Sequence, residues 1–244
     1  MHDILFQARA ICDDSDVAAQ GSRITIELII YLSWRSLSGI NLTAVASELK
    51  KKRDILIPGC DGAGLVTAVG SSVKDFRPGD RVVTHLAPKL VEASGDDAPS
   101  TIADISATLG SGNAGTLRSH TVFLEGALVP APKSLDWLRA SSLTYTWTTA
   151  WNALYRLKDK RIGPGSWVLI QGTGGVSVAI LELAVAAGAN VVGTTSTEDR
   201  VARLAEPGAT HTINYRTKPE SWGAEARAQT PGGRGFDIGY QCGR

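Results

Sequence analysis

The hydrophobic pattern of the chain changes near residue 134. Before this point, short runs of β-branched residues alternate with Gly and Pro, which is typical of strands joined by tight turns. The runs predict strands over residues 64–70, 80–84, 120–124 and 127–129. Residues 86–118 are rich in Gly, Ser and Asp, and we expect them to form a long loop.

Beyond residue 134, helical and extended patterns alternate. Ser134 can cap a helix that runs through Leu157. Such alternation predicts parallel β-α-β units, so the fold class is α/β. Further strands are predicted over 167–171, 190–194, 211–214 and 236–240, and helices between them over 176–187, 198–206 and 221–229.

The helix predicted over 176–187 follows directly from the strand at 167–171. Gly188 is expected to end it as a C-cap. Its apolar residues recur at the spacing of one helical face, namely Val176, Ile180, Leu183, Ala184 and Ala187.

The junction between this strand and this helix carries the sharpest functional signal, QGTGGVS over residues 171–177. Gly172 permits a tight turn and Gly174 lets a pyrophosphate approach the backbone, while the helix N-terminus offers free N–H groups and partial positive charge. Ser177 replaces the third glycine of the usual fingerprint, so the match is imperfect. The motif predicts a dinucleotide site formed by Gly172, Thr173, Gly174, Gly175 and Val176.

The end of the next strand predicts which cofactor binds. A site that prefers NAD usually carries Asp or Glu there, for the ribose hydroxyls. Here the strand ends in Thr195 and Ser196, which are neutral, and Arg200 follows within reach of a 2′-phosphate. Arg200 could instead be a solvated helix residue paired with a nearby acid. The missing carboxylate favours NADP(H).

Composition narrows the class of protein. Of 244 residues, 43% are hydrophobic and 20% are charged, with a formal net charge of +1, which is ordinary for a soluble globular protein and unlike a nucleic-acid binder. The three cysteines are far apart and lack C-x-x-C spacing, which argues against a disulfide scaffold or a cysteine-rich zinc site. Because no signal-peptide pattern or membrane-length apolar stretch occurs, we expect a cytoplasmic protein with no membrane partner.

Several motifs, taken in order, resemble the medium-chain dehydrogenase/reductase superfamily, in particular its zinc-independent, quinone-oxidoreductase-like branch. The resemblance covers about residues 53–244 and implies a GroES-like catalytic domain over 1–134, in which 1–52 are atypical, and a Rossmann domain over 135–244. It also implies that a small-molecule substrate and the nicotinamide bind between the domains. The motifs are IPGCDGAGLVTAVG (57–70), FRPGDRVV (76–83), GTLRSHTVFLEGALVPAPKSL (115–135), TTAWNAL (148–154), PGSWVLIQGTGGVS (164–177) and GATHTINYR (208–216).

The resemblance also assigns individual residues. It places Thr149 beside the nicotinamide and Tyr215 near the adenosine phosphate, although Thr149 is also plausible as a plain helix residue. Metal-dependent members hold catalytic zinc at three positions, which fall here at Trp34, Cys60 and Tyr145. Only Cys60 could bind zinc, so we expect no metal. The carbonyl of the substrate would then be polarised by hydrogen-bond donors or bound water, and no general acid is assigned.

Departures from the family leave the activity open. Residues 1–22 lack the usual first hairpin, Tyr145 and Trp147 are larger than their counterparts, and the chain stops at Arg244 where relatives continue. We therefore expect a truncated chain with an incomplete doubly wound sheet in the order 3-2-1-4, and a homodimer for full-length relatives rather than for this chain. Two functions are open: a metal-free NADP(H)-dependent reductase of a quinone, enone, aldehyde or ketone, or a non-catalytic nucleotide-binding remnant. A zinc-dependent alcohol dehydrogenase is a third.

Overall fold

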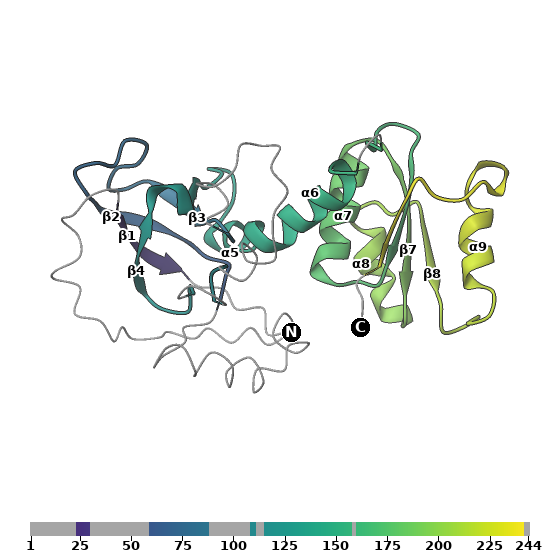
Figure 1. The fold of residues 1–244 in the computed structure, drawn as a ribbon. Helices are drawn as coiled ribbons and strands as arrows, with labels where there is room; N and C mark the ends of the chain where they lie inside the picture. The colour runs from purple at the N-terminus through teal and green to yellow at the C-terminus, as the bar shows by residue number, and fades with distance from the viewer. Residues whose placement is uncertain (1–22, 30–58, 88–107, 111–114, 158–159, 242–244) are drawn as a thin grey trace, which may run out of the picture. The chain divides into compact units, whose positions relative to one another are not determined.

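The computed structural model describes residues 23–29, 59–87, 108–110, 115–157 and 160–241. The chain divides into two compact units, Met1–Tyr145 and Thr146–Arg244. Figure 1 shows a β-rich first unit and an α/β second unit. The predictions for residues 1–22, for Trp34 and for most of the loop over 86–118 lie outside the described residues.

A five-stranded antiparallel sheet in the order β4-β1-β2-β3-β5 forms the first unit. The four strands predicted in this part of the chain are confirmed to within two residues. β1 was not predicted, although it lies inside the sheet between β2 and β4 and its alternate residues Ile24 and Ile26 are fully buried. The strands are β1 (Arg23–Ile29), β2 (Ala63–Val69), β3 (Arg81–Thr84), β4 (His120–Leu124) and β5 (Leu128–Pro130), with a 3-10 turn, η2, over Glu125–Ala127.

The helix predicted from Ser134 to Leu157 is wrong in its start and in its continuity. Asp136, not Ser134, caps the first piece, because its carboxylate accepts the backbone N–H of Arg139 at 2.7 Å. The helical ladder is then interrupted where Asp61 Oδ1 accepts the backbone N–H of Tyr145 at 2.8 Å. The three pieces are α5 (Trp137–Ser141), the π-helical turn η3 (Leu143–Trp147) and α6 (Thr148–Tyr155).

The second unit is built on a four-stranded parallel sheet in the order β8-β7-β6-β9. This confirms the predicted 3-2-1-4 order of a doubly wound fold. The helix predicted over 198–206 is instead the 3-10 turn η4 followed by α8. The elements are β6 (Trp167–Gln171), α7 (Gly175–Ala186), β7 (Asn190–Thr195), η4 (Glu198–Arg200), α8 (Ala202–Ala205), β8 (His211–Asn214), α9 (Trp222–Ala228), the 3-10 turn η5 (Pro231–Gly233) and β9 (Ile238–Gln241).

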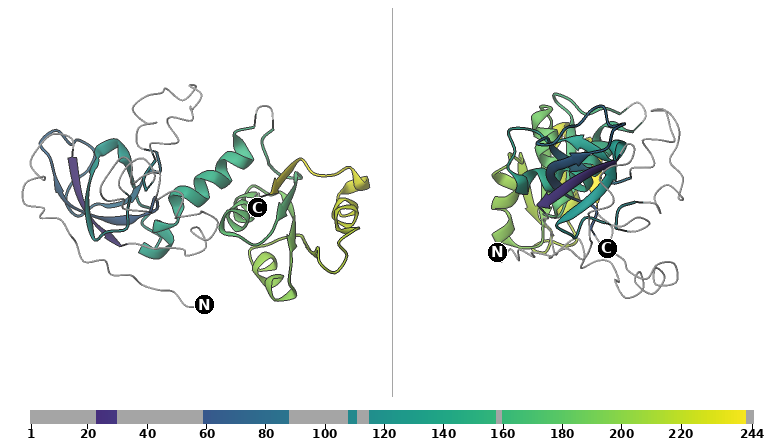
Figure 2. Two further views of the ribbon diagram at one scale, coloured as in Figure 1. Left: turned by 60° about the horizontal axis from the view of Figure 1, so that its bottom comes forward. Right: turned by 90° about the vertical axis from the view of Figure 1, so that its left-hand side faces the viewer.

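Helices cover both faces of this sheet, with α7 and α8 on one side and α9 on the other (Figures 1 and 2). Alternate strand residues serve the two sides, because successive side chains of a strand point to opposite faces. Val168 and Ile170 belong to the core with α7, whereas Trp167 packs with α9. On α7, Ile180 and Ala184 are fully buried as predicted, while the other predicted face residues, Val176, Leu183 and Ala187, are only half-buried.

Gly188 ends α7 as predicted, in a Schellman motif. Its N–H donates to the carbonyl of Val185 at 2.9 Å, and the N–H of Ala189 donates to the carbonyl of Ala184 at 3.0 Å. The φ angle of Gly188 is +78°, a value that L side chains rarely adopt. The motif turns the chain directly into β7.

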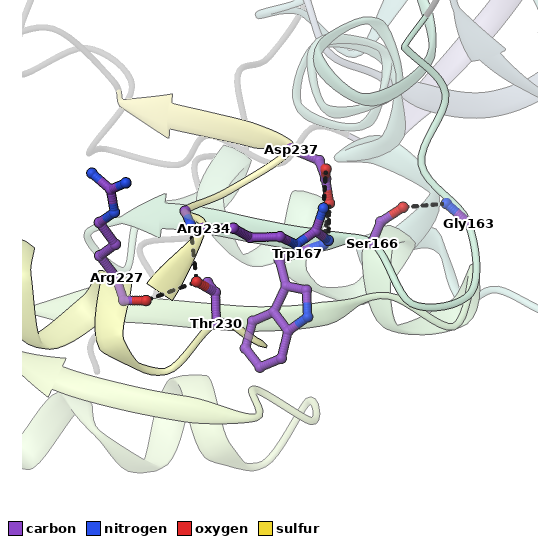
Figure 3. Close-up of polar contacts among 8 residues, drawn as sticks. Gly163, Ser166, Trp167, Arg227, Thr230, Arg234 and Asp237 are labelled. Carbon is purple, nitrogen blue, oxygen red and sulfur yellow. Dashed lines mark hydrogen bonds and ion pairs between the residues drawn. The ribbon is translucent and has the colours of Figure 1, made fainter. Parts of the chain in front are cut away.

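The amino ends of β6 and β9 are joined by a polar network (Figure 3). Asp237 accepts the backbone N–H of Trp167 at 2.8 Å with its carboxylate and donates its own N–H to the carbonyl of Trp167 at 2.8 Å. Arg234 pairs with the same carboxylate at 3.3 Å. This network fixes the register of the parallel pair β6 and β9, whose carboxyl ends therefore reach the same edge of the sheet.

Candidate cofactor-binding site

The predicted glycine turn lies between β6 and α7, the context that a dinucleotide site requires. Gly172 has a φ angle of +87°, so the turn needs glycine there. Its N–H donates to the carbonyl of Thr194 at 2.9 Å, which ties the turn to the end of β7. Thr173 is buried and Val176 is half-buried, so these two side chains pack inward while the backbone of the turn lines the edge.

Ser177 explains the imperfect third position of the fingerprint. Its side chain is buried, and its hydroxyl donates to the carbonyl of Gln171 at 3.3 Å. That position normally serves close packing of the helix against the strand. The serine keeps this contact with a hydrogen bond, so the substitution does not disturb the turn.

The end of β7 carries Thr195 and Ser196, followed by the turn η4 with Arg200. Thr195 is buried, and its hydroxyl donates to the carbonyl of Thr197 at 3.2 Å. Within the described residues, no carboxylate forms an ion pair with Arg200. The alternative, that Arg200 is paired with a nearby acid, therefore has no support among the residues that are described.

Tyr215 follows β8 and lies beside this strand end. Its backbone N–H donates to the carbonyl of Thr195 at 3.0 Å. Nine of the ten predicted cofactor residues thus lie at the carboxyl edge of the parallel sheet, where open α/β sheets bind ligands. They are contributed by the β6–α7 turn, by the β7 end with η4, and by the β8 end.

The tenth residue, Thr149, lies on α6. This helix packs against α7, and Thr146, just before α6, lies beside Gly175 of the glycine turn. A Cβ built on Gly175 would lie 3.7 Å from Cγ2 of Thr146. The start of α6 therefore borders the start of α7, with Thr149 one turn further along the helix.

The turn leaves a cradle that a dinucleotide would fill. Gly174 has an ordinary φ of −73°, and a Cβ built on it would meet no described atom within 4 Å. Nothing in the described protein thus requires glycine at position 174. Helix α7 begins there without a side-chain cap, so its first N–H groups are available to phosphate oxygens.

After the end of β7, the buried hydroxyl of Thr197 has no hydrogen-bond partner among the described residues. The residues present fit a bound dinucleotide.

The first unit holds a second group of functional side chains, at the turn before β2. The carbonyls of this turn are held by threonines, since Thr84 Oγ1 donates to Cys60 at 3.0 Å and Thr116 Oγ1 donates to Asp61 at 2.7 Å. The carboxylate of Asp61 accepts the N–H of Tyr145. Cys60 and Tyr145, two of the three positions that the resemblance aligns with zinc ligands, thus lie on segments joined by a direct hydrogen bond. Sequence reasoning did not assign a role to Asp61.

Burial governs the ionisation of this group. It raises the pKa of Asp61 to about 6, and the N–H of Tyr145 only partly offsets it. Burial, together with the charge of Asp61, raises the pKa of Cys60 to about 12. Partial burial also lowers the pKa of His85. Within the described ranges, no three His, Cys, Asp or Glu side chains are grouped closely enough to hold a metal ion.

Two family models match the chain. Residues 25–133 match the alcohol dehydrogenase GroES-like domain, and residues 175–243 match the zinc-binding dehydrogenase family. These ranges fall within the β-rich first unit and the α/β second unit. The chain belongs to the medium-chain dehydrogenase/reductase superfamily.

Known proteins of this superfamily are similar to the chain. A zinc-type alcohol dehydrogenase-like protein of Schizosaccharomyces pombe is 40% identical, with 76% of this chain and 50% of the relative covered. A chloroplastic NADPH-dependent alkenal/one oxidoreductase of Arabidopsis thaliana is 30% identical over 65% of this chain and 36% of its own length. A crystal structure of an NAD-dependent alcohol dehydrogenase superposes with a TM-score of 0.71 at 28% identity, covering 97% of this chain and 69% of that chain.

The chain spans about half of the length of the first of these curated relatives. Among the described residues, no helix combines the length and the apolar character needed to cross a membrane. The names of these relatives specify different cofactors, NADPH for the Arabidopsis protein and NAD for the alcohol dehydrogenase. The choice between the two cofactors therefore depends on the residues of this chain.

Proposed function

We propose that the protein is an NADP(H)-dependent oxidoreductase that reduces a quinone, an enone, or an aldehyde or ketone without a metal ion. The observation that carries the proposal is the end of β7. It presents Thr195 and Ser196 in place of a carboxylate, and Arg200, the last residue of η4, forms no ion pair among the described residues. A guanidinium with free N–H groups is suited to the doubly charged 2′-phosphate of NADP(H).

The proposed roles follow from position. The N–H groups at the start of α7 and the open turn at Gly174 would hold the pyrophosphate. Arg200 and Tyr215, at neighbouring strand ends, would hold the adenosine 2′-phosphate. Thr149, on the helix that borders the glycine turn, would lie toward the nicotinamide end.

The cofactor supplies a hydride to the acceptor when bound, and a proton from water completes the reduction. The residues of the chain would bind and orient the cofactor and shield it from water. The glycine turn would hold the diphosphate through the N–H groups at the start of α7. In the first unit, the half-buried turn with Cys60 and Asp61 offers a protonated thiol and a carboxyl of raised pKa.

Two comparisons bear on this proposal. The Arabidopsis relative, 30% identical, is named for NADPH and for alkenal and enone substrates, which supports both parts. The NAD-dependent neighbour is 28% identical and matches over more of this chain, so it argues for NAD with comparable weight. The neutral strand end at Thr195 and Ser196, together with Arg200, supports NADP(H) in this proposal.

Oxidation of NADPH by the purified chain, with 1,4-benzoquinone, crotonaldehyde and a saturated aldehyde as separate acceptors, tests the proposal. We expect turnover with at least one acceptor, slower turnover with NADH, and no change after treatment with a zinc chelator. Activity that is lost on chelation and restored by zinc would identify a zinc alcohol dehydrogenase instead. Binding of NADPH without turnover on any acceptor would identify a nucleotide-binding protein that is not a catalyst.

A further inference from the structure

The turn η4 carries two acidic residues, Glu198 and Asp199, directly before Arg200. A carboxylate at this position can oppose the 2′-phosphate in two ways. It can compete with the 2′-phosphate for the guanidinium of Arg200. It can also accept hydrogen bonds from the ribose hydroxyls of NAD, which favours that cofactor. In the described part of the chain, neither acid pairs with Arg200. Glu198 has a partner on the neighbouring strand instead.

That partner is Asn214, the last residue of β8. Its Nδ2 donates to Glu198 Oε1 at 2.7 Å, and its Oδ1 accepts the backbone N–H of Arg216 at 3.0 Å. Because a backbone donor occupies the amide oxygen, the NH₂ group has to face Glu198, so the orientation of the amide is determined. The asparagine is further fixed by its carbonyl, which accepts the hydroxyl of Thr217 at 2.8 Å.

The register of the sheet puts this contact at the candidate site. Asn214 pairs with Thr195 across β8 and β7, so it stands beside the neutral strand end that distinguishes the two cofactors. The next residue, Tyr215, donates its N–H to the carbonyl of Thr195. The amide of Asn214 therefore reaches Glu198 from a rigid strand end, where its position is set by backbone hydrogen bonds.

We propose that Asn214 is a specificity-determining residue, which secures the preference for NADP(H) by holding the Glu198 carboxylate on the β8 side of η4. Held there, the carboxylate neither captures Arg200 nor accepts a ribose hydroxyl. Asn214 is a positioning residue, since it acts through Glu198. The inference rests on the proposed NADP(H) function of the site.

Fluorescence titration of NADPH and NADH at low salt, with the wild-type chain and Asn214→Ala, tests the inference. We expect the ratio of the Kd for NADH to the Kd for NADPH to fall about five- to tenfold in the variant, because a freed carboxylate competes for the guanidinium. The double variant Asn214→Ala/Glu198→Gln should recover the wild-type ratio, and Glu198→Gln alone should keep it. If Asn214→Ala does not fold, Asn214→Asp provides the test instead. This variant retains the acceptor for the N–H of Arg216 but places a second carboxylate against Glu198, so it should also lower the ratio.

The outcomes separate this inference from the function on which it rests. A wild-type chain that binds both cofactors equally would overturn the NADP(H) proposal itself. A wild-type preference that Asn214→Ala leaves unchanged would overturn only the role of Asn214. Equal weakening of both cofactors would show a structural role, and a ratio that the double variant does not recover would exclude Glu198 as the agent.

Discussion

The carboxylate of Asp61 accepts the backbone N–H of Tyr145 at 2.8 Å, across 84 residues of sequence. The bond joins the turn before β2 to the π-helical turn η3. Thr144 ties η3 to the end of β3 as well, since its hydroxyl donates to the carbonyl of Thr84 at 2.5 Å. The geometry of η3 is thus set by long-range contacts, because Asp61 takes an N–H that an uninterrupted helix would use.

The first prediction follows from the raised pKa of Asp61. A carboxyl whose pKa is about 6 in the folded state, against an ordinary value of 3.8, contributes stability that is present below pH 3.8 and lost as the pH rises through 6. Asp61→Asn keeps an oxygen acceptor for the N–H of Tyr145, and because the amide does not ionise, its stability is not lost as the pH rises. The free energy of unfolding of the variant, relative to wild type, should rise by up to about 3 kcal/mol between pH 4 and pH 7.

Urea unfolding at pH 4, 5, 6 and 7 measures this difference. Asp61→Leu is the matched control, because it removes the acceptor and should be less stable than Asp61→Asn at every pH. A difference between Asp61→Asn and wild type that stays constant over this range would show that Asp61 does not titrate as expected.

The second prediction concerns Cys60. A thiol with a pKa of about 12 holds little thiolate at pH 8, so alkylation of Cys60 by iodoacetamide should be at least about tenfold slower than that of an ordinary thiol. Mass spectrometry in a Cys12→Ser/Cys242→Ser background isolates this residue. Adding Asp61→Asn removes the second cause of the raised pKa and should speed the reaction. Alkylation at the rate of free cysteine would refute the burial argument.

The third prediction concerns the glycine turn. Gly174 has an ordinary φ and open space around its Cβ position, so Gly174→Val should leave the circular-dichroism spectrum and unfolding temperature nearly unchanged while abolishing nucleotide binding. Gly172→Val is the contrast, because its φ of +87° makes a side chain costly and the variant should also unfold at lower temperature. If the Gly174 variant binds NADPH as tightly as wild type, the turn is not the phosphate site.

Much of the fold follows from local patterns in the sequence. Strand periods, the glycine turn and the C-cap at Gly188 each depend on a few neighbouring residues, and the structure has them within one or two positions of the prediction. Ser134 was the wrong cap: the helix is capped two residues on by Asp136, a residue type that is about as good an N-cap as serine. Local rules cannot separate two such candidates when the helix that follows is itself interrupted.

What the sequence missed depends on contacts between distant residues. Asp61 reaches Tyr145 and Asn214 reaches Glu198 only after the strands are paired, so no spacing rule along the chain reveals either contact. β1 was missed for a different reason. Its alternation of Ile24 and Ile26 with polar residues was present, but it lies within a longer apolar stretch that hides the period of two.

Titration of the wild-type chain and of Arg200→Ala with NADPH and NADH tests whether Arg200 selects NADP(H). The wild type should bind NADPH more tightly than NADH. Arg200→Ala should weaken NADPH binding by roughly 1–3 kcal/mol, the scale of a lost charge-assisted hydrogen bond, and leave NADH binding unchanged. Equal affinities of the wild-type chain for NADPH and NADH would contradict the account.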